Sequence, residues 1–380
     1  FGMDNYNFSV DGIKYWDMGQ GSYLTDGKAG MSSGKSVTER LFSLFARANY
    51  SYQDKYMLSA SIRHEGSSKF AADNRWANFW SATAGWRISN EEFMKDFDWL
   101  DDLKIRFGYG VTGNNDFSAT YMANMLGSDT NWMMPNGTWA YSYGKSQNVN
   151  PNLGWEEKKE WNLGVDYSFF NGRLYGKFDY YRRKVDNLLF SVKVPQPPYT
   201  QGSQMQNIGS MESKGWEFEV GGDIIRTKDF TWSSNLNLSH NKGKILTLEG
   251  DNSYHNGNGF VAPGSPGDAA RMEAGSTIGS FYIWKFAGFD DEGSFLLYNK
   301  DGEVIPAAQK TENDKQFIGN YTPKLILGWS HTLTYKNFDL GISMRSWIDF
   351  DVYNTINMYY GIQGQGNLNV LKDAYGKFNH

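Results

Sequence analysis

Strict alternation of apolar and polar side chains recurs along this chain and limits its fold more than any other feature. The alternation is clearest from Trp161 to Phe169, where every second residue is aromatic or aliphatic, and it resumes from Leu174 to Tyr180. A period of two indicates β-strands, because successive side chains point to opposite faces of a sheet. Asn171-Gly172 joins the two arms, and both residue types tolerate the positive φ of a tight turn. We therefore predict an antiparallel hairpin here.

The hairpin pattern repeats, and the links between strands alternate between short and long. About ten strands with one apolar and one polar face are predicted in all. The short turns are predicted at residues 53–55, 171–172, 228–229 and 336–337, and the long connections near 113–158, 191–214, 245–322 and 349–380. Outer-membrane barrels sort their links in this way, with short periplasmic turns and long extracellular loops. One link at the end with the short turns is longer than the others, because a helix capped by Asn90 is predicted there from Glu91 to Leu100.

Composition supports strands whose two faces meet different solvents. Aromatic residues make up 17% of the chain, although its mean hydropathy is only −0.60. No apolar run reaches the roughly 18 residues that a membrane helix requires. The fold class predicted is all-β, an antiparallel transmembrane β-barrel. The lipid-facing residues are predicted to include Trp161, Val165, Phe178, Phe218 and Leu327, and the lumen-facing residues Asp166, Asp179, Glu219 and Asn235.

The sequence offers no convincing catalytic or metal-binding constellation, so we predict that the chain is not an enzyme and needs no cofactor. There is no cysteine, and the five histidines lack the short spacings of a metal site. Gly108, Gly110 and Gly113 match a dinucleotide fingerprint in form only, because no helix follows them. The net charge of −5 gives no reason to expect nucleic acid. The run Arg182-Arg183-Lys184 is read as a solvated rim, with contact to anionic lipid headgroups as the alternative.

Aromatic residues in the long connections form a second population. Between Asn131 and Gly144 they are mixed with amides, hydroxyls and glycine, without any Lys or Arg. A sugar ring offers an apolar face for stacking and hydroxyls at its edge, so this mixture favours carbohydrate, whereas loop-on-loop packing is the competing interpretation. The predicted substrate-binding residues are Asn131, Trp132, Asn136, Trp139, Tyr141 and Tyr143.

Several motifs resemble the SusC/RagA family of TonB-linked outer-membrane transporters. They run in order along most of the chain and are found at Arg63–Phe70, Gly85–Phe93, Tyr109–Asn115, Asn150–Trp155, Trp161–Gly164, Asn207–Met211, Lys214–Phe218 and Phe281–Gly293. The resemblance implies that residues 1–380 are a C-terminal-half segment of one barrel of about 22 strands, closed by a plug that lies elsewhere in the protein. It also implies the outer membrane of a Gram-negative bacterium.

The function implied by this resemblance is import of a large nutrient. An oligosaccharide is the leading substrate, and a peptide or an iron chelate is the alternative. An alternative function from a different class is that of a passive porin or an adhesin. The implied partners are a SusD-like surface lipoprotein, TonB (through a segment absent from this chain) and a second transporter–lipoprotein pair.

Overall fold

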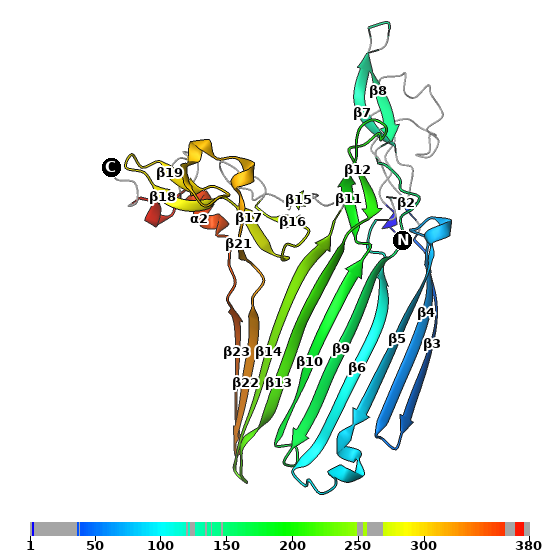
Figure 1. Ribbon diagram of the computed structural model, residues 1–380, viewed down its shortest axis with the longest axis vertical. Helices are drawn as coiled ribbons and strands as arrows, with labels where there is room; N and C mark the ends of the chain where they lie inside the picture. The colour runs from blue at the N-terminus through cyan, green and yellow to red at the C-terminus, as the bar shows by residue number, and fades with distance from the viewer. Residues whose placement is uncertain are drawn as a thin grey trace.

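The computed structural model describes residues 2–3, 36–37, 39–118, 121, 126–133, 135–137, 139–145, 147–248, 254–256, 269–361 and 369–375. Its main feature is one sheet of ten antiparallel strands in the order β23-β22-β14-β13-β10-β9-β6-β5-β4-β3 (Figure 1). These strands are β3 (Leu41–Tyr52), β4 (Tyr56–Ser67), β5 (Trp76–Arg87), β6 (Leu100–Asn114), β9 (Glu156–Phe169), β10 (Leu174–Asp186), β13 (Ser210–Arg226), β14 (Phe230–Thr247), β22 (Leu325–Tyr335) and β23 (Phe338–Ile348). The predicted strand number and the antiparallel arrangement are confirmed.

The strand register extends the apolar rows across the whole sheet. Val165 lies opposite both Phe178 and Ile105, and Phe178 lies opposite Phe218. Directly opposed residues share a face. One row therefore runs across the ten strands through Tyr52, Tyr56, Trp86, Ile105, Val165, Phe178, Phe218, Leu238, Leu327 and Ser346. All five residues predicted to face lipid lie on this face, because Trp161 is four residues from Val165 on the same strand.

The opposite face carries the polar residues. Asp166 pairs in register with Lys177, and Asp179 pairs with Glu217. Asp166, Asp179, Glu219 and Asn235 all share this face by strand alternation. The sheet therefore has one apolar face and one polar face, as expected of a barrel wall between lipid and water.

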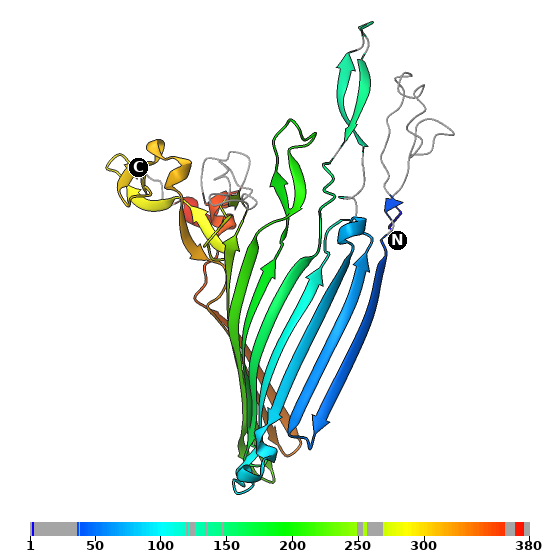
Figure 2. The ribbon, with the colours of Figure 1, turned by 45° about the vertical axis from the view of Figure 1, so that its right-hand side comes forward.

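Short and long links lie at opposite ends of the sheet (Figure 2). The turn after β9 has three successive residues at positive φ, namely Phe170, Asn171 and Gly172. Asp101 accepts the backbone N–H of Asn171 (3.0 Å) and of Gly172 (2.8 Å), which fixes this turn from the neighbouring strand. Gln53, Asp54 and Lys336 also take positive φ in their turns.

The long connections contain strands of their own. Hairpins are formed by β7 (Leu126–Met133) with β8 (Trp139–Lys145), and by β11 (Leu189–Lys193) with β12 (Ser203–Asn207). Further small sheets combine β1 (Gly2–Met3) with β2 (Ser36–Val37), β15 (Tyr254–Asn256) with β16 (Arg271–Glu273), β17 (Ser280–Ile283) with β21 (Gln316–Asn320), and β18 (Lys285–Phe289) with β19 (Phe295–Tyr298) and β20 (Val304–Pro306). The connections predicted only as loops are thus partly ordered as strands that protrude beyond the main sheet (Figures 1 and 2).

The helical elements are short. They are α2 (Thr355–Tyr360) and the 3-10 turns η1 (Ala72–Asn74), η2 (Ile88–Asn90), η3 (Glu92–Met94), η5 (Ala307–Gln309), η6 (Glu312–Asp314) and η7 (Lys372–Tyr375). Among the described residues, no helix has the length and apolarity needed to cross a membrane, a finding that does not bear on β-barrels.

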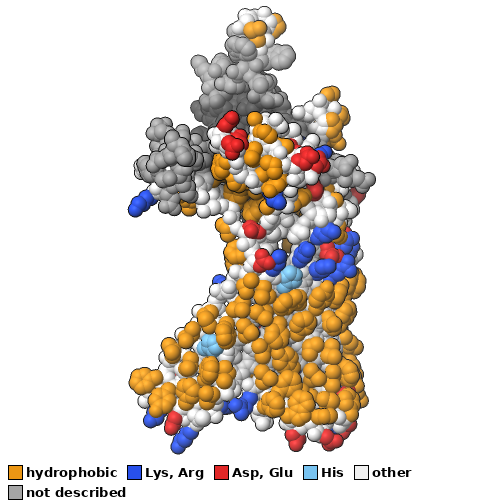
Figure 3. Space-filling model, turned by 60° about the vertical axis from the view of Figure 1, so that its left-hand side comes forward, with side chains coloured by type: hydrophobic (Ala, Val, Ile, Leu, Met, Phe, Trp, Pro, Cys, Tyr) orange, Lys and Arg blue, Asp and Glu red, His pale blue; other side chains and the backbone are white. Residues whose placement is uncertain are grey.

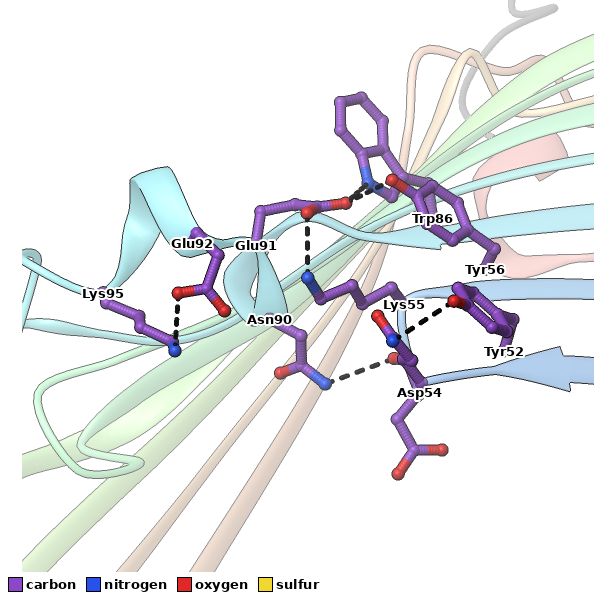
Figure 4. Close-up of polar contacts among 10 residues, drawn as sticks. Tyr52, Asp54, Lys55, Tyr56, Trp86, Asn90, Glu91, Glu92 and Lys95 are labelled. Atoms are coloured by element: carbon purple, nitrogen blue, oxygen red, sulfur yellow. Dashed lines mark hydrogen bonds and ion pairs between the residues drawn. The ribbon is translucent and has the colours of Figure 1, made fainter.

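The helix predicted from Glu91 to Leu100 is wrong. The 3-10 turn η2 ends just before this segment, η3 is the one short helical turn near its start, and β6 already begins at Leu100. Glu91 itself is extended (φ −74°, ψ 149°), because its carboxylate is bound from outside the segment by Tyr56 Oη (2.6 Å), Trp86 Nε1 (3.0 Å) and Lys55 Nζ (3.2 Å) (Figure 4). Tertiary hydrogen bonds therefore override the local helical pattern.

Candidate ligand-binding site

A small aromatic core lies where the long connections leave the sheet. It consists of the buried residues Phe70, Phe79, Val111, Phe117, Leu153 and Trp155. The Phe70 ring packs at 5.0 Å from the Trp155 ring and at 5.2 Å from the Phe117 ring. Gly113 is required here, because a Cβ at this position would lie 2.0 Å from the Phe79 ring. This core anchors both ends of connection 113–158, so the hairpin above it starts from a fixed base.

Side-chain amides tie two distant segments together above this base. Asn148 Nδ2 donates to the carbonyls of Gln201 (2.6 Å) and Ser203 (2.8 Å), and Asn150 Nδ2 donates to Met205 (2.9 Å). Asn207 accepts from the Gly154 N–H (2.7 Å) and donates to its carbonyl (2.8 Å). Residues 147–154 and the β11–β12 hairpin, about fifty residues apart in sequence, are therefore held as one unit.

These amides line a cavity of about 420 Å³ without a charged residue in its wall. The lining consists of Asn150, Pro151, Asn152, Tyr199, Gln204, Gln206 and Asn207. Most of the amides are engaged, since Gln206 donates to Gln204 (3.0 Å) and Gln204 donates to the Val149 carbonyl (3.1 Å). Within the described part of the chain, the side chains of Asn152 and Tyr199 make no hydrogen bond. One amide and one aromatic ring with its hydroxyl are therefore available to a ligand.

The residues predicted to bind substrate belong to the neighbouring β7–β8 hairpin. Its backbone register places Asn131 opposite Tyr141, Met133 opposite Trp139, and Ser128 opposite Tyr143. Trp132 lies opposite Ala140, and Asn136 is exposed in the turn. The side chains of Asn131, Trp132, Trp139, Tyr141 and Tyr143 lie outside the described residues, so their role stays a prediction. Gln201 Nε2 donates to the Lys145 carbonyl (2.6 Å), which links the end of this hairpin to the amide-bound unit.

Sequence reasoning missed the amides of the cavity. The motifs Asn150-Pro-Asn and Asn207-Ile-Gly were visible in the chain, but nothing local indicates that they meet. Tyr199 belongs to the loop aromatics that we expected to have a binding or packing role. The available signal was the density of Asn and Gln in two connections that both lie at the long-link end.

The acidic loops hold no metal cluster in the part of the chain that the structure describes. Asp290 Oδ1 accepts the N–H groups of Glu292 (3.0 Å) and Ser294 (2.7 Å) in its own turn. Asn299 Oδ1 accepts those of Asp301 (3.0 Å) and Glu303 (2.8 Å). Both sequences are therefore turns closed by their own side chains.

Long antiparallel strands with one apolar face, and with links sorted by length between the two ends, define a segment of a transmembrane β-barrel. The family model described as "TonB dependent receptor-like, beta-barrel" matches residues 1–354, and the chain belongs to this family. The chain accordingly belongs to an outer-membrane protein of a Gram-negative bacterium and crosses the membrane with β-strands. This confirms the predicted fold class and localisation.

Individual relatives agree with the family. The chain is 34% identical over 345 residues to TonB-dependent receptor SusC of Bacteroides thetaiotaomicron, covering 86% of this chain and 33% of that protein. It is 33% identical to TonB-dependent receptor P3 of Formosa agariphila, covering 83% of this chain and 32% of the relative. The solved structure of the RagAB peptide transporter matches with a TM-score of 0.71 at 26% identity, over 82% of this chain and 34% of the matched chain. The chain thus spans about a third of the length of these relatives, and the SusC/RagA resemblance is confirmed.

Proposed function

We propose that this chain is part of a TonB-dependent importer that takes up oligosaccharides across the outer membrane with a SusD-like surface lipoprotein. The observation that carries the proposal is the uncharged cavity lined by amides and Tyr199 at the long-link end. Family membership supplies the transport class. The long-link end is the extracellular end in this proposal, because barrels of this kind keep their short turns in the periplasm.

The chemistry of the cavity suits a neutral, hydroxyl-rich ligand. Amides both donate and accept hydrogen bonds, so a preorganised set of them can match the alternating hydroxyls of a sugar. Tyr199 adds an aromatic face and a hydroxyl. An anionic iron chelate would favour a cationic pocket, and neither the lining nor the segment from Asn131 to Gly144 contains Lys or Arg.

A peptide is the second candidate substrate, and one specific observation favours it. The matched RagAB structure is described as that of a peptide transporter. Amide side chains also pair well with a peptide backbone, which offers one donor and one acceptor per residue. Uptake assays therefore need both substrate classes.

Energy supply and closure of the barrel require sequence beyond these ten strands. A lumen wide enough for a plug needs about 22 strands. We propose that the remaining strands, the plug and the TonB-contacting segment lie in the rest of the protein. A dimer of transporter–lipoprotein pairs is part of the same proposal.

The test uses the full-length transporter at matched surface expression. Asn152→Ala and Tyr199→Ala remove the two polar cavity side chains that have no hydrogen-bond partner among the described residues. Trp132→Ala and Trp139→Ala each remove one aromatic side chain from the β7–β8 hairpin. We expect a roughly 2- to 12-fold loss of oligosaccharide uptake for each, since one ring contact or one hydrogen bond contributes about 0.5–1.5 kcal/mol. Phe93→Ala removes an exposed aromatic at the short-turn end; it is the control and should leave uptake unchanged.

The uptake results distinguish an oligosaccharide importer from a peptide importer, and both from loops with a purely structural role. Loss of peptide uptake with intact oligosaccharide uptake would transfer the proposal to peptides. Wild-type uptake of both substrates in all four variants would show that these loops are structural. Co-purification of the surface lipoprotein with each variant shows whether the variant still binds its partner.

A further inference from the structure

We propose that a basic patch on the apolar face of the sheet binds the phosphate groups of lipid A, the lipopolysaccharide anchor in the outer leaflet. The patch comprises Lys159, Arg182, Lys184, Lys214, Lys242 and Lys244. The inference rests on the membrane orientation given under Proposed function. It concerns a surface separate from the ligand cavity.

Strand register places all six side chains on the apolar face. Arg182 lies opposite Trp161 on one side and Lys214 on the other, and Lys214 lies opposite Lys242. By alternation these residues share the face of Phe178 and Phe218. They therefore point away from the polar face, and neither a lumenal substrate nor a plug can neutralise them.

The patch begins directly above an aromatic row. Tyr180 lies opposite Trp216, which lies opposite His240, and the ring of Trp161 packs at 5.4 Å from that of Tyr180. Such aromatic girdles mark the edge of the hydrocarbon layer. Two residues further along the strands, about 7 Å away, this face becomes cationic. Figure 3 shows Lys and Arg side chains gathered at the upper border of the hydrophobic surface.

The patch has more positive charge than its own acids can neutralise. Asp186 pairs with Lys184 (2.8 Å) and Lys159 (3.2 Å), and Glu212 accepts from Arg182 Nε (2.7 Å). Glu157 pairs with Lys159 (3.3 Å). Within the described part of the chain, Lys214, Lys242 and Lys244 form no ion pair, and all three are exposed.

The register itself argues for an anion between these lysines. Lys214 and Lys242 are directly opposed on adjacent strands, an arrangement of like charges that destabilises a sheet. Lys244 extends the same face by two residues and lies opposite Glu212, whose carboxylate is bound by Arg182. An external anion would convert this repulsion into charge-assisted hydrogen bonds.

A hollow beside Lys242 provides room for a headgroup. Pairing between β14 and β22 ends at Ser239 and Ile326, and a cavity of about 500 Å³ lies beyond it, with Lys242, Lys324, Asp349 and Asp351 as the charged residues of its lining. Asp351 accepts the backbone N–H of Asn320 (2.8 Å). Lys324 is already paired with Asp349 (2.6 Å). Of the two lysines that line this hollow, Lys242 is the one without an ion pair to the described residues, so it is available to a ligand.

The position of the patch at the membrane interface indicates which anion it meets. Clusters of basic residues at the membrane interface recognise anionic headgroups. At the long-link end, this interface belongs to the outer leaflet, where the lipid carries phosphate on a sugar headgroup. Lipid A phosphates are therefore the anions that meet these lysines from the membrane side.

The experiment measures binding of lipid A to the purified full-length protein in neutral detergent, with bound lipid quantified by native mass spectrometry. The variant carries Lys214→Gln, Lys242→Gln and Lys244→Gln together. We expect its affinity for lipid A to fall at least ~10-fold, because each basic residue near an anionic surface contributes roughly a fivefold preference. Dephosphorylated lipid A should bind the wild-type protein as weakly as lipid A binds the variant.

A matched control removes the same charge elsewhere. Lys95→Gln, Lys228→Gln and Lys336→Gln lie at the short-turn end and should leave lipid A binding unchanged. Loss in this control instead of the first variant would overturn the orientation and the inference with it. Equal binding of phosphatidylglycerol or of inorganic phosphate would overturn the assignment to lipid A.

The remaining alternative is that the basic patch binds a protein partner instead of lipid A. If the first variant kept lipid A but lost the surface lipoprotein, the patch would be a protein interface and the inference wrong. Heat-modifiable migration on gels verifies that both variants form the barrel. Substrate uptake is measured in a separate assay. The lipid A binding result can therefore be interpreted even if the proposed transport function is wrong.

Discussion

Arg106 shows how single residues distinguish the two faces of the sheet. Its guanidinium donates to both carboxylate oxygens of Asp166 (2.7 and 2.8 Å) and also pairs with Asp179 (3.2 Å). Gly164 leaves room for this contact, since a Cβ there would lie 2.7 Å from Arg106 Cζ. Charged groups on the polar face thus find partners across strands, whereas residues one position away in sequence belong to the opposite, mainly apolar face.

A charge placed in those rows should be costly. Val165→Arg puts a guanidinium in the row between Ile105 and Phe178. We expect the free energy of unfolding of the full-length barrel to fall by about 2–4 kcal/mol, the cost of a cation near the bilayer midplane. Asn162→Arg, on the polar face of the same strand, should cost much less. Equal stabilities for the two variants, measured by reversible unfolding in lipid vesicles, would contradict the proposed lipid-facing assignment.

At the scale of elements, the link between β5 and β6 depends on one carboxylate. Glu91 is held by three side chains from β4, β5 and the turn before β4 (Figure 4). The hydrogen bond from Tyr56, with those from Trp86 and Lys55, lowers the pKa of Glu91 below its ordinary value. Asn90 adds a bond from its Nδ2 to the Asp54 carbonyl (3.2 Å). Two neighbouring links at the short-turn end are thereby joined.

This carboxylate makes the link sensitive to acid. Because the pKa is lowered on folding, its stabilisation is fully present above the ordinary carboxyl pKa and is lost as the pH falls through the lowered value. Hydrogen exchange in residues 88–101, corrected for intrinsic rates, should therefore speed up over that window. Glu91→Gln should exchange faster at neutral pH and show no further acid step. An identical acid step in both proteins would assign the transition to another group.

At the scale of the whole molecule, the sheet is a wall with two open edges. Within the described residues, the outer edges of β3 and β23 pair with no other strand. Unpaired edges are aggregation hazards that barrels remove by closure. We therefore expect the rest of the transporter to supply strands against both edges.

The orientation of this wall is testable because the chain contains no cysteine. Asp291→Cys lies in the exposed turn between β18 and β19 at the long-link end, and Lys228→Cys lies in the exposed turn between β13 and β14. In intact cells expressing a full-length protein without other accessible cysteines, a membrane-impermeant maleimide should label only the first. Both should react after the outer membrane is opened. Labelling of Lys228→Cys in unbroken cells would reverse the proposed topology.

The sequence allowed prediction of the strands because a period of two is a local signal. Val165 and Phe178 could be assigned to one face from their own neighbours, and Asn171-Gly172 to a turn from its residue types. The segment from Glu91 to Leu100 could not be predicted in this way, because its conformation depends on Tyr56 and Trp86. The candidate cavity could not be predicted either, since Asn150 and Asn207 meet only after two connections fold against each other.

The sequence by itself determined the fold class, the two faces of the wall and the division between short and long links. These follow from residue types and spacings along one strand or across one turn, where the physical interactions are local. Only the tertiary structure decided which long connections bind each other, where the aromatic core fixes them, and which lysines lie opposite each other on adjacent strands. Those features depend on register between strands that are far apart in the chain, and register is a property of the assembled sheet.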